Sequence, residues 1–150
     1  WIDSPSVGDS EAKMADASYA HEIRIPSTTH EGQRVQEQIL SSLRQHAFSD
    51  KILFAIRLCL EEALINAIKH GNRLDPQKLV HIRYSIDEDG FSIEIEDEGP
   101  GFDPQTIPDP TLPENLERPS GRGLLLMRAY MTNCVWLDRG NICRMRRTKE

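Results

Sequence analysis

The amino-acid sequence predicts an α+β fold in the form of a two-layer sandwich. Its expected elements follow the order strand, two helices, two strands, long loop, helix and two strands, with no internal repeat. Apolar residues recur at helical spacing in the expected helices and alternate in the expected strands. With 150 residues, 38% hydrophobic and 28% charged, the chain has the size and composition of one soluble globular domain.

The N-terminal half holds a strand and two helices. An imperfect alternation predicts a strand over residues 19–25, which ends in capping residues at 26–29. A helix over 30–47 follows, and Ser49 and Asp50 cap a second helix that should end near Gly71. The second helix has an apolar stripe at helical spacing, formed by Leu53, Ile56, Leu60, Ala63, Leu64 and Ala67. Residues 1–18 are rich in Ser, Asp and Ala without any period, so we expect a disordered tail before a domain over 19–150.

The C-terminal half holds two hairpins separated by a loop and a short helix. Four strands are expected, over residues 79–86, 91–96, 135–138 and 142–145. Turn sequences at 87–90 and 139–140 join them in antiparallel pairs. The loop over 99–120 contains six of the nine prolines, and long loops in compact domains are usually lids or binding segments, so we expect residues 103–120 to form a lid. A short helix should follow over 124–131.

Charge, apolar runs and cysteines limit the possible partners. A net charge of −6 disfavours direct nucleic-acid binding, which depends on Lys and Arg neutralising phosphates. The longest uncharged apolar run, residues 124–127, is too short to cross a bilayer. The three cysteines form no C-x-x-C pair and cannot all be bridged, which favours a reducing compartment. We therefore expect a cytoplasmic protein that binds proteins or small ligands.

The first motif that could carry chemistry lies near the end of the second helix. Glu62, Asn66 and His70 are four residues apart, so they should share one ridge opposite the apolar stripe. A carboxylate and a carboxamide oxygen one turn apart could hold a water and Mg²⁺, which prefers oxygen ligands. The alternative is an ordinary solvated helix face, where Glu and Asn are common.

The second motif, residues 97–102, directly follows the strand over 91–96. Gly99 and Gly101 allow backbone conformations that a Cβ would forbid, and they let a flat ligand approach the main chain. Asp97 could accept a hydrogen bond from an amino group such as that of adenine. The alternative is a plain turn, because Asp, Gly and Pro are the commonest turn residues.

The third motif is Gly121-Arg122-Gly123, where the helix over 124–131 begins. Free N–H groups at a helix start, with glycines permitting close approach, favour a bound phosphate, and Arg122 adds a cation. The third glycine of a dinucleotide fingerprint is missing, because position 126 is Leu, and no G-K-[ST] phosphate loop occurs. The histidines and cysteines show no spacing typical of a zinc site.

In this order, the three motifs resemble the N, G1 and G2 boxes of the GHKL ATPase superfamily, which includes gyrase, heat-shock chaperones and histidine kinases. The sequences NAIKHGN (66–72) and GRGLLLM (121–127) most resemble those of the bacterial anti-sigma factor serine/threonine kinases. The resemblance covers roughly residues 19–147. It implies a GHKL-type, histidine-kinase-like ATPase fold, with a mixed sheet, helices on one face, and the nucleotide between helices and sheet under a lid.

The resemblance also implies roles for the motif residues. Glu62 would be the catalytic base or the carboxylate that positions water, and Asn66 would bind Mg²⁺ within the nucleotide site. Asp97 would accept the adenine amino group, and Arg122 would lie near the phosphates. The glycines would shape the backbone around base and phosphates: Gly99, Gly101, Gly121 and Gly123.

Two features depart from the family pattern. The family often has Gly-Thr at the last hairpin, where the Thr supports the adenine-binding Asp, whereas Asn141 follows Gly140 here. An Asn can still donate a hydrogen bond. The prolines of residues 103–119 predict a stiffer lid than is usual in the family, because each proline fixes φ and removes a donor.

The resemblance implies an ATP-dependent serine/threonine protein kinase (EC 2.7.11 class) that uses ATP and Mg²⁺. Its implied partners are a sigma factor and a STAS-domain antagonist that is phosphorylated on Ser or Thr. One alternative is a binding module that sequesters its partner with ATP as a structural ligand, although the presence of both Glu62 and Asn66 favours the enzyme. Another is a histidine kinase fragment, but one helix before the first motif is too little for a dimerisation hairpin. The sequence does not specify the partner, the oligomeric state or the natural N-terminus. A homodimer is one of the possible oligomeric states.

Overall fold

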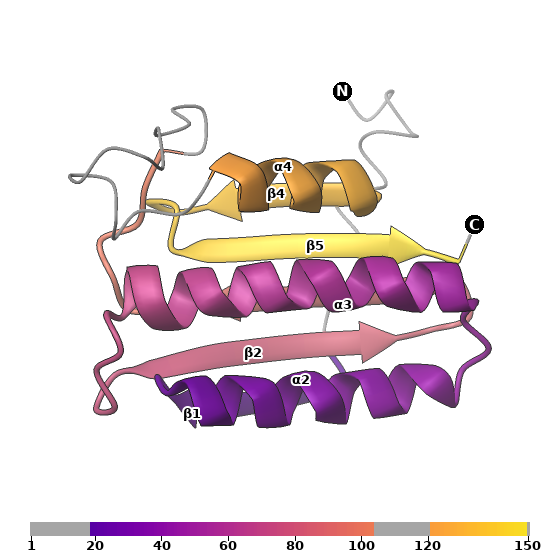
Figure 1. Cartoon of the computed structure of the whole chain (residues 1–150), viewed down its shortest axis with the longest axis horizontal. Coiled ribbons are helices and arrows are strands. Elements are labelled where there is room, and N and C mark those ends of the chain that lie inside the picture. Colours follow the sequence, from indigo (N-terminus) through magenta and orange to yellow (C-terminus); the bar gives the residue numbers. More distant parts are fainter. Residues whose placement is uncertain (1–18, 104–120, 150) are drawn as a thin grey trace.

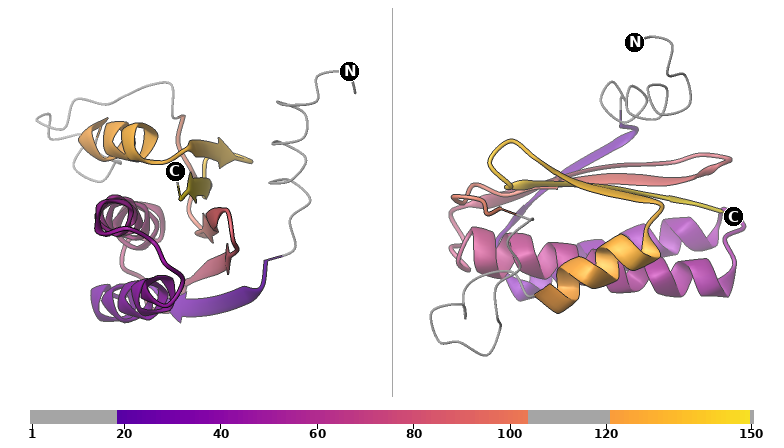
Figure 2. Two further views of the ribbon diagram at one scale, coloured as in Figure 1. Left: turned by 90° about the vertical axis from the view of Figure 1, so that its right-hand side faces the viewer. Right: turned by 90° about the horizontal axis from the view of Figure 1, so that it is seen from above.

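The computed structural model describes residues 19–103 and 121–149, with only the backbone of residues 121 and 122. These residues form the predicted two layers, and Figure 1 shows the helices in front of the sheet. All of these helices lie on one face of the five-stranded sheet (Figure 2). The predicted tail over 1–18 and the predicted lid, apart from Asp103, lie outside the described residues. No described helix is long and apolar enough to cross a membrane.

Helices α2 (Thr29–Arg44) and α3 (Asp50–Ile65) begin after capping hydroxyls. Thr28 Oγ1 accepts a hydrogen bond from the N–H of Glu31 at 3.3 Å, and Ser49 Oγ accepts one from Ile52 at 3.2 Å. Helix α2 ends before the predicted residue 47, because Ala47 has a φ of 57° and cannot continue the helix. The predicted apolar stripe faces the core, although Leu53 is only partly buried. The buried residues of α3 are Ile52, Ala55, Ile56, Cys59, Leu60, Ala63 and Leu64.

The strands lie close to their predicted positions, and the two predicted antiparallel hairpins form, but the sheet as a whole is not mixed. They are β1 (His21–Pro26), β2 (Leu79–Ile86), β3 (Gly90–Glu96), β4 (Asn133–Leu137) and β5 (Ile142–Thr148). Their order is β1-β2-β3-β5-β4, and every neighbouring pair is antiparallel. The prediction of a mixed sheet is therefore wrong. Strands β3 and β4 run in the same direction, but β5 lies between them and runs against both, so no parallel pair forms.

The core lies between the sheet and the helices. Alternate strand residues point toward the helices, and those that are fully buried include Ile82, Ile93 and Ile95. Helix α4 (Gly121–Tyr130) packs on α3 and contributes the fully buried Leu124 and Met127. Each such side chain stabilises the fold by about 1.5–3 kcal/mol.

The opposite face of the sheet is polar and carries a row of charged residues across three strands. Glu94 on β3 accepts hydrogen bonds from Arg83 on β2 and from Arg144 on β5, with Arg144 Nη2 2.6 Å from Glu94 Oε2. Glu94 is only 5% exposed. Burial alone would raise the pKa of Glu94, but the hydrogen bonds from Arg144 and Arg83 outweigh it and hold the pKa below its ordinary value.

Asn72 is a buried hub that joins four chain segments at one end of the sheet. Its Nδ2 donates to Ser27 Oγ at 2.9 Å and to the carbonyl oxygen of Leu79 at 3.1 Å. Its Oδ1 accepts from the N–H of Glu98 at 2.7 Å. Asn72 and Ser27 are fully buried, so these bonds fix the chain after β3 relative to β1, β2 and the end of the helix.

Candidate functional site

The sequence predicted that the second helix would end near Gly71, but the α-helix α3 already ends at Ile65. From Asn66 to Gly71 it widens into a π-helix, and the N–H of Asn72 bonds to the carbonyl oxygen of Ala67 at 2.9 Å, five residues back. Such π-turns are rare and often occur at functional sites. Here the wider turn presents four residues to one cleft: Asn66, Ala67, His70 and Gly71.

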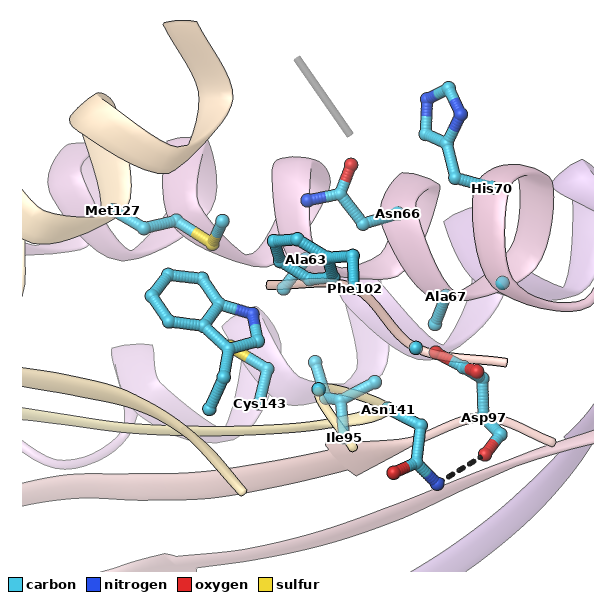
Figure 3. A pocket seen from close by; sticks show the side chains of 14 residues that line it. Ala63, Asn66, Ala67, His70, Ile95, Asp97, Phe102, Met127, Asn141 and Cys143 are labelled. Atoms are coloured by element: carbon cyan, nitrogen blue, oxygen red, sulfur yellow. Dashed lines mark hydrogen bonds between the residues drawn. The ribbon is translucent and has the colours of Figure 1, made fainter. Parts of the chain in front are cut away.

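The cleft lies between this helix and the sheet, at the end of β3 and beside β4 and β5 (Figure 3). It encloses about 450 Å³, open solvent included. Besides the four π-helical residues, its walls are formed by Ala63, Ile95, Asp97, Gly101, Phe102, Met127, Trp136, Gly140, Asn141 and Cys143. The structure thus brings residues of the first two sequence motifs into the walls of the cleft, whereas the third motif contacts Glu62 through Gly123.

Asp97 lies directly after β3 and faces the π-helix (Figure 3). Its Oδ1 accepts a hydrogen bond from the N–H of Gly99 at 2.8 Å. A Cβ at Gly71 would overlap the Asp97 carboxylate, so this close approach requires glycine. Burial raises the pKa of Asp97 to about 6, although the Gly99 N–H and the charge of Arg139 act to lower it. A perturbed acid in a cleft is typical of a functional site.

The last hairpin supports Asp97 through its main chain. The N–H of Asp97 donates to the carbonyl oxygen of Asn141 at 3.0 Å, and Asn141 Nδ2 donates to the carbonyl oxygen of Asp97 at 3.1 Å. Asn141, the residue that departs from the GHKL pattern, therefore holds the Asp97 backbone through its donor. Its Oδ1 is buried and has no hydrogen-bond partner among the described residues.

Asn66 presents a second buried amide whose Nδ2 has no partner within the described parts of the chain. Its side chain extends from the helix on the cleft side (Figure 3). Leaving a buried polar group unpaired costs about 1–3 kcal/mol, so this N–H donor favours a bound acceptor such as a phosphate oxygen or a water. Among the described residues, no three His, Cys, Asp or Glu side chains are grouped to hold a metal ion. Mg²⁺ at Asn66 would bind the amide oxygen Oδ1 rather than Nδ2, and it would depend on phosphate oxygens and water for its other ligands, as Mg²⁺ commonly does.

Glu62 lies beside the cleft rather than in its wall. It is one turn before Asn66, and a Cβ at Gly123 of α4 would overlap Glu62 Oε1. The predicted common ridge therefore divides: Asn66 and His70 line the cleft, whereas Glu62 lies against the start of α4.

The glycines of the second motif fit against other parts of the protein. A Cβ at Gly99 would overlap the carbonyl oxygen of Gly71. Gly101 has a φ of 79°, and a Cβ there would overlap the carbonyl oxygen of Arg139. These contacts join the loop to the π-helix and to the last hairpin. The role of these glycines toward a ligand stays a prediction.

The third motif forms the first turn of α4, which begins at Gly121, before the predicted start at residue 124. The N–H groups of a first helical turn lack partners within the helix and favour an anion. The Arg122 side chain lies outside the described residues. The phosphate site at Gly121, Arg122 and Gly123 stays a prediction.

Two aromatic residues of the cleft were not predicted from the sequence. Phe102 and Trp136 pack edge to face, with ring centroids 5.9 Å apart and planes at 75°. Alternation in the strand over 135–138 could have placed Trp136 on the helix side. Its position in the cleft, however, depends on pairing across β5, which local sequence does not specify.

Comparison with known proteins supports the resemblance seen in the motifs. The model of the family described as "Histidine kinase-like ATPase domain" matches residues 25–147. The serine/threonine-protein kinase BtrW of Bordetella bronchiseptica is 31% identical over 86 residues, 56% of this chain and 61% of that protein. The anti-sigma F factor of Halalkalibacterium halodurans is 41% identical over 80 residues, 51% and 53% of the two chains. The serine-protein kinase RsbW of Oceanobacillus iheyensis is 31% identical over 90 residues, 56% and 57%. The chain spans a little over half the length of these relatives.

Proposed function

We propose, since the chain belongs to the family of histidine kinase-like ATPase domains, that it is a serine/threonine protein kinase of the anti-sigma factor type. It would bind Mg-ATP and phosphorylate a small regulatory protein in the cytoplasm, with a sigma factor and a STAS-domain antagonist as partners. Relatives named anti-sigma F factor and serine-protein kinase support this proposal. The observation that carries it is the meeting of half-buried Asp97 with two unpartnered amide atoms, Asn66 Nδ2 and Asn141 Oδ1, in one cleft.

Each of the three motifs would bind one part of the nucleotide. The Asp97 carboxylate would accept a hydrogen bond from the adenine amino group. Such a bond is favourable because a charged acceptor binds an N–H group more strongly than a neutral one. The first turn of α4, from Gly121 to Gly123, would bind phosphate through its N–H groups, and Arg122 would add a positive charge. Asn66 would hold Mg²⁺, which when bound neutralises charge on the phosphates.

Glu62 would act as the general base. It is one helical turn from Asn66 and adjacent to Gly123, so it lies next to both the proposed ion site and the proposed phosphate site. Its carboxylate would take the proton of a substrate Ser or Thr hydroxyl while the hydroxyl oxygen bonds to the γ-phosphorus and ADP leaves.

Two substitutions test the proposal, with nucleotide binding measured by calorimetry and transfer measured with labelled ATP. Asp97→Ala should weaken ATP binding about tenfold or more, because a hydrogen bond to a charged acceptor contributes about 1.5–3 kcal/mol. Glu62→Gln should leave binding unchanged and slow transfer to candidate STAS proteins about a hundredfold or more. Glu61→Gln, the exposed neighbour on the same helix, is the matched control and should change neither.

The outcomes separate the enzyme from its alternatives. Equal transfer by the wild type and Glu62→Gln would remove Glu62 from the mechanism. If neither transfers phosphate while both bind ATP and the partner, the protein is a sequestering module. If the wild type binds no ATP, the proposed function is wrong.

A further inference from the structure

The aromatic pair of the cleft, Phe102 and Trp136, has no role in the proposed function. Trp136 of β4 contacts Phe102 edge to face, and the guanidinium carbon of Arg128 lies 5.4 Å from the centroid of the Trp136 ring. A cation at this distance is attracted to the ring face. The indole is thus held from two sides while it lines the cleft, so little side-chain freedom would be lost when a ligand meets it.

Strand pairing places Trp136 at the far end of a continuous apolar floor. Ile95 of β3 pairs with Cys143 of β5, and Cys143 pairs with Trp136, so the three side chains form one row on the helix-facing side of the sheet. All three line the cleft. Because neighbouring strands are about 4.8 Å apart, the row extends about 10 Å across the sheet. Asp97 lies two residues after Ile95, at the opposite end of the floor.

We propose that Trp136 is a stacking surface for the nucleobase of the bound nucleotide. This inference rests on the proposed binding of ATP. A flat base with its amino group at Asp97 would extend over the apolar floor toward the indole, and stacking on an indole is favourable for any base because every base has a π-face. Asp97 would therefore select for an amino group, whereas Trp136 would add affinity for a base of any kind.

Three probes separate these two roles: ATP, inosine triphosphate, which lacks the amino group, and inorganic tripolyphosphate, which lacks the base. Trp136→Leu should weaken ATP and inosine triphosphate alike, about tenfold to a hundredfold, and leave tripolyphosphate unchanged. Asp97→Ala should weaken ATP far more than inosine triphosphate. Trp136→Phe should restore most of the binding lost in Trp136→Leu. Phe54→Leu, at an aromatic side chain that is 59% exposed on α3, is the matched control and should bind all probes normally.

A second measurement needs no change at Trp136. The chain contains two tryptophans, so Trp1→Phe leaves Trp136 as the single indole. Saturating ATP or inosine triphosphate should quench its fluorescence, and tripolyphosphate should not. ATP that binds without changing this fluorescence, or a Trp136→Leu variant that binds ATP as tightly as the wild type, would overturn the proposal. Equal weakening of all three probes would show a structural role instead. A wild type that binds no nucleotide would refute the proposed function itself.

Discussion

Replacing Asp97 by Asn should stabilise the nucleotide-free protein at neutral pH, although it should weaken the proposed binding of ATP. Burial raises the pKa of Asp97 from 3.8 to about 6, so the fold disfavours the ionised carboxylate. At about 1.4 kcal/mol per pKa unit this corresponds to about 3 kcal/mol. Since the side chain is only half-buried, solvent screening reduces the effect to about 1–2 kcal/mol. Asn is isosteric, fits beside Gly71, and keeps an oxygen for the Gly99 N–H.

The stabilisation should depend on pH in a defined direction. The pKa of Asp97 is higher in the folded protein than in the unfolded chain. The destabilisation by this carboxylate is therefore absent below about pH 3, where Asp97 is protonated in the folded and the unfolded protein alike. It grows between about pH 4 and 6, where chiefly the unfolded chain is ionised, and is complete above that range. The increase in the free energy of unfolding caused by Asp97→Asn should therefore reach about one third of its full size at pH 4.5 and its full size at pH 7.5.

Urea unfolding of the nucleotide-free protein at these two pH values measures the gain, and calorimetry with ATP measures the loss of binding. Asp89→Asn is the control for removing one negative charge, because Asp89 is exposed in the turn before the opposite end of β3. A gain of the same size at both pH values, or a variant less stable than the wild type at pH 7.5, would refute the reasoning.

Two further substitutions test the buried polar contacts. Asn72→Ala should lower the free energy of unfolding by about 2–4 kcal/mol, because it removes one hydrogen bond each from Ser27 Oγ, the Leu79 carbonyl oxygen and the Glu98 N–H, and urea unfolding would detect it. If the variant keeps the stability of the wild type, water molecules make the hydrogen bonds that Asn72 makes in the wild type. Glu94→Gln should cost about 2–3 kcal/mol at pH 7, because Arg83 and Arg144 lose their shared carboxylate. Since the pKa of Glu94 is lowered in the fold, the wild type should lose its greater stability over Glu94→Gln as the pH falls below about 4. A stability difference between the two proteins that stays constant down to pH 3 would contradict the argument.

Local features of the fold could be predicted from the sequence. Ser49 caps α3 as expected, and the apolar stripe of that helix faces the core, because both depend on spacing within one element. The hairpin turns likewise depend on a few adjacent residues. For the same reason, the sequence could indicate candidate site residues, since Asp97 directly follows a strand and Asn66 directly follows a helix with a clear apolar period.

Features that depend on distant contacts were not predictable. The π-helix forms where Gly71 fits against the Asp97 carboxylate, a contact between residues far apart in the sequence. The antiparallel sheet depends on β5 pairing with both β3 and β4, and this pairing also brings Trp136 to the cleft. Neither contact leaves a signal within a short window of sequence, because hydrophobic period reports the type of an element and not its neighbour.

The position of β5 has a consequence for how the protein is made. Of the described strands, β5 is the last to leave the ribosome, yet it is hydrogen-bonded on both sides, and β4 is bonded to β5 alone. Until β5 emerges, one edge of β3 and the whole of β4 lack partners, and unpaired strand edges promote association between chains. Asn141 and Cys143 of the cleft also arrive only with this last hairpin. The cleft can therefore close only after nearly the whole domain has been synthesised, and a nascent chain stalled before residue 142 would be a target for chaperones rather than a nucleotide-binding intermediate.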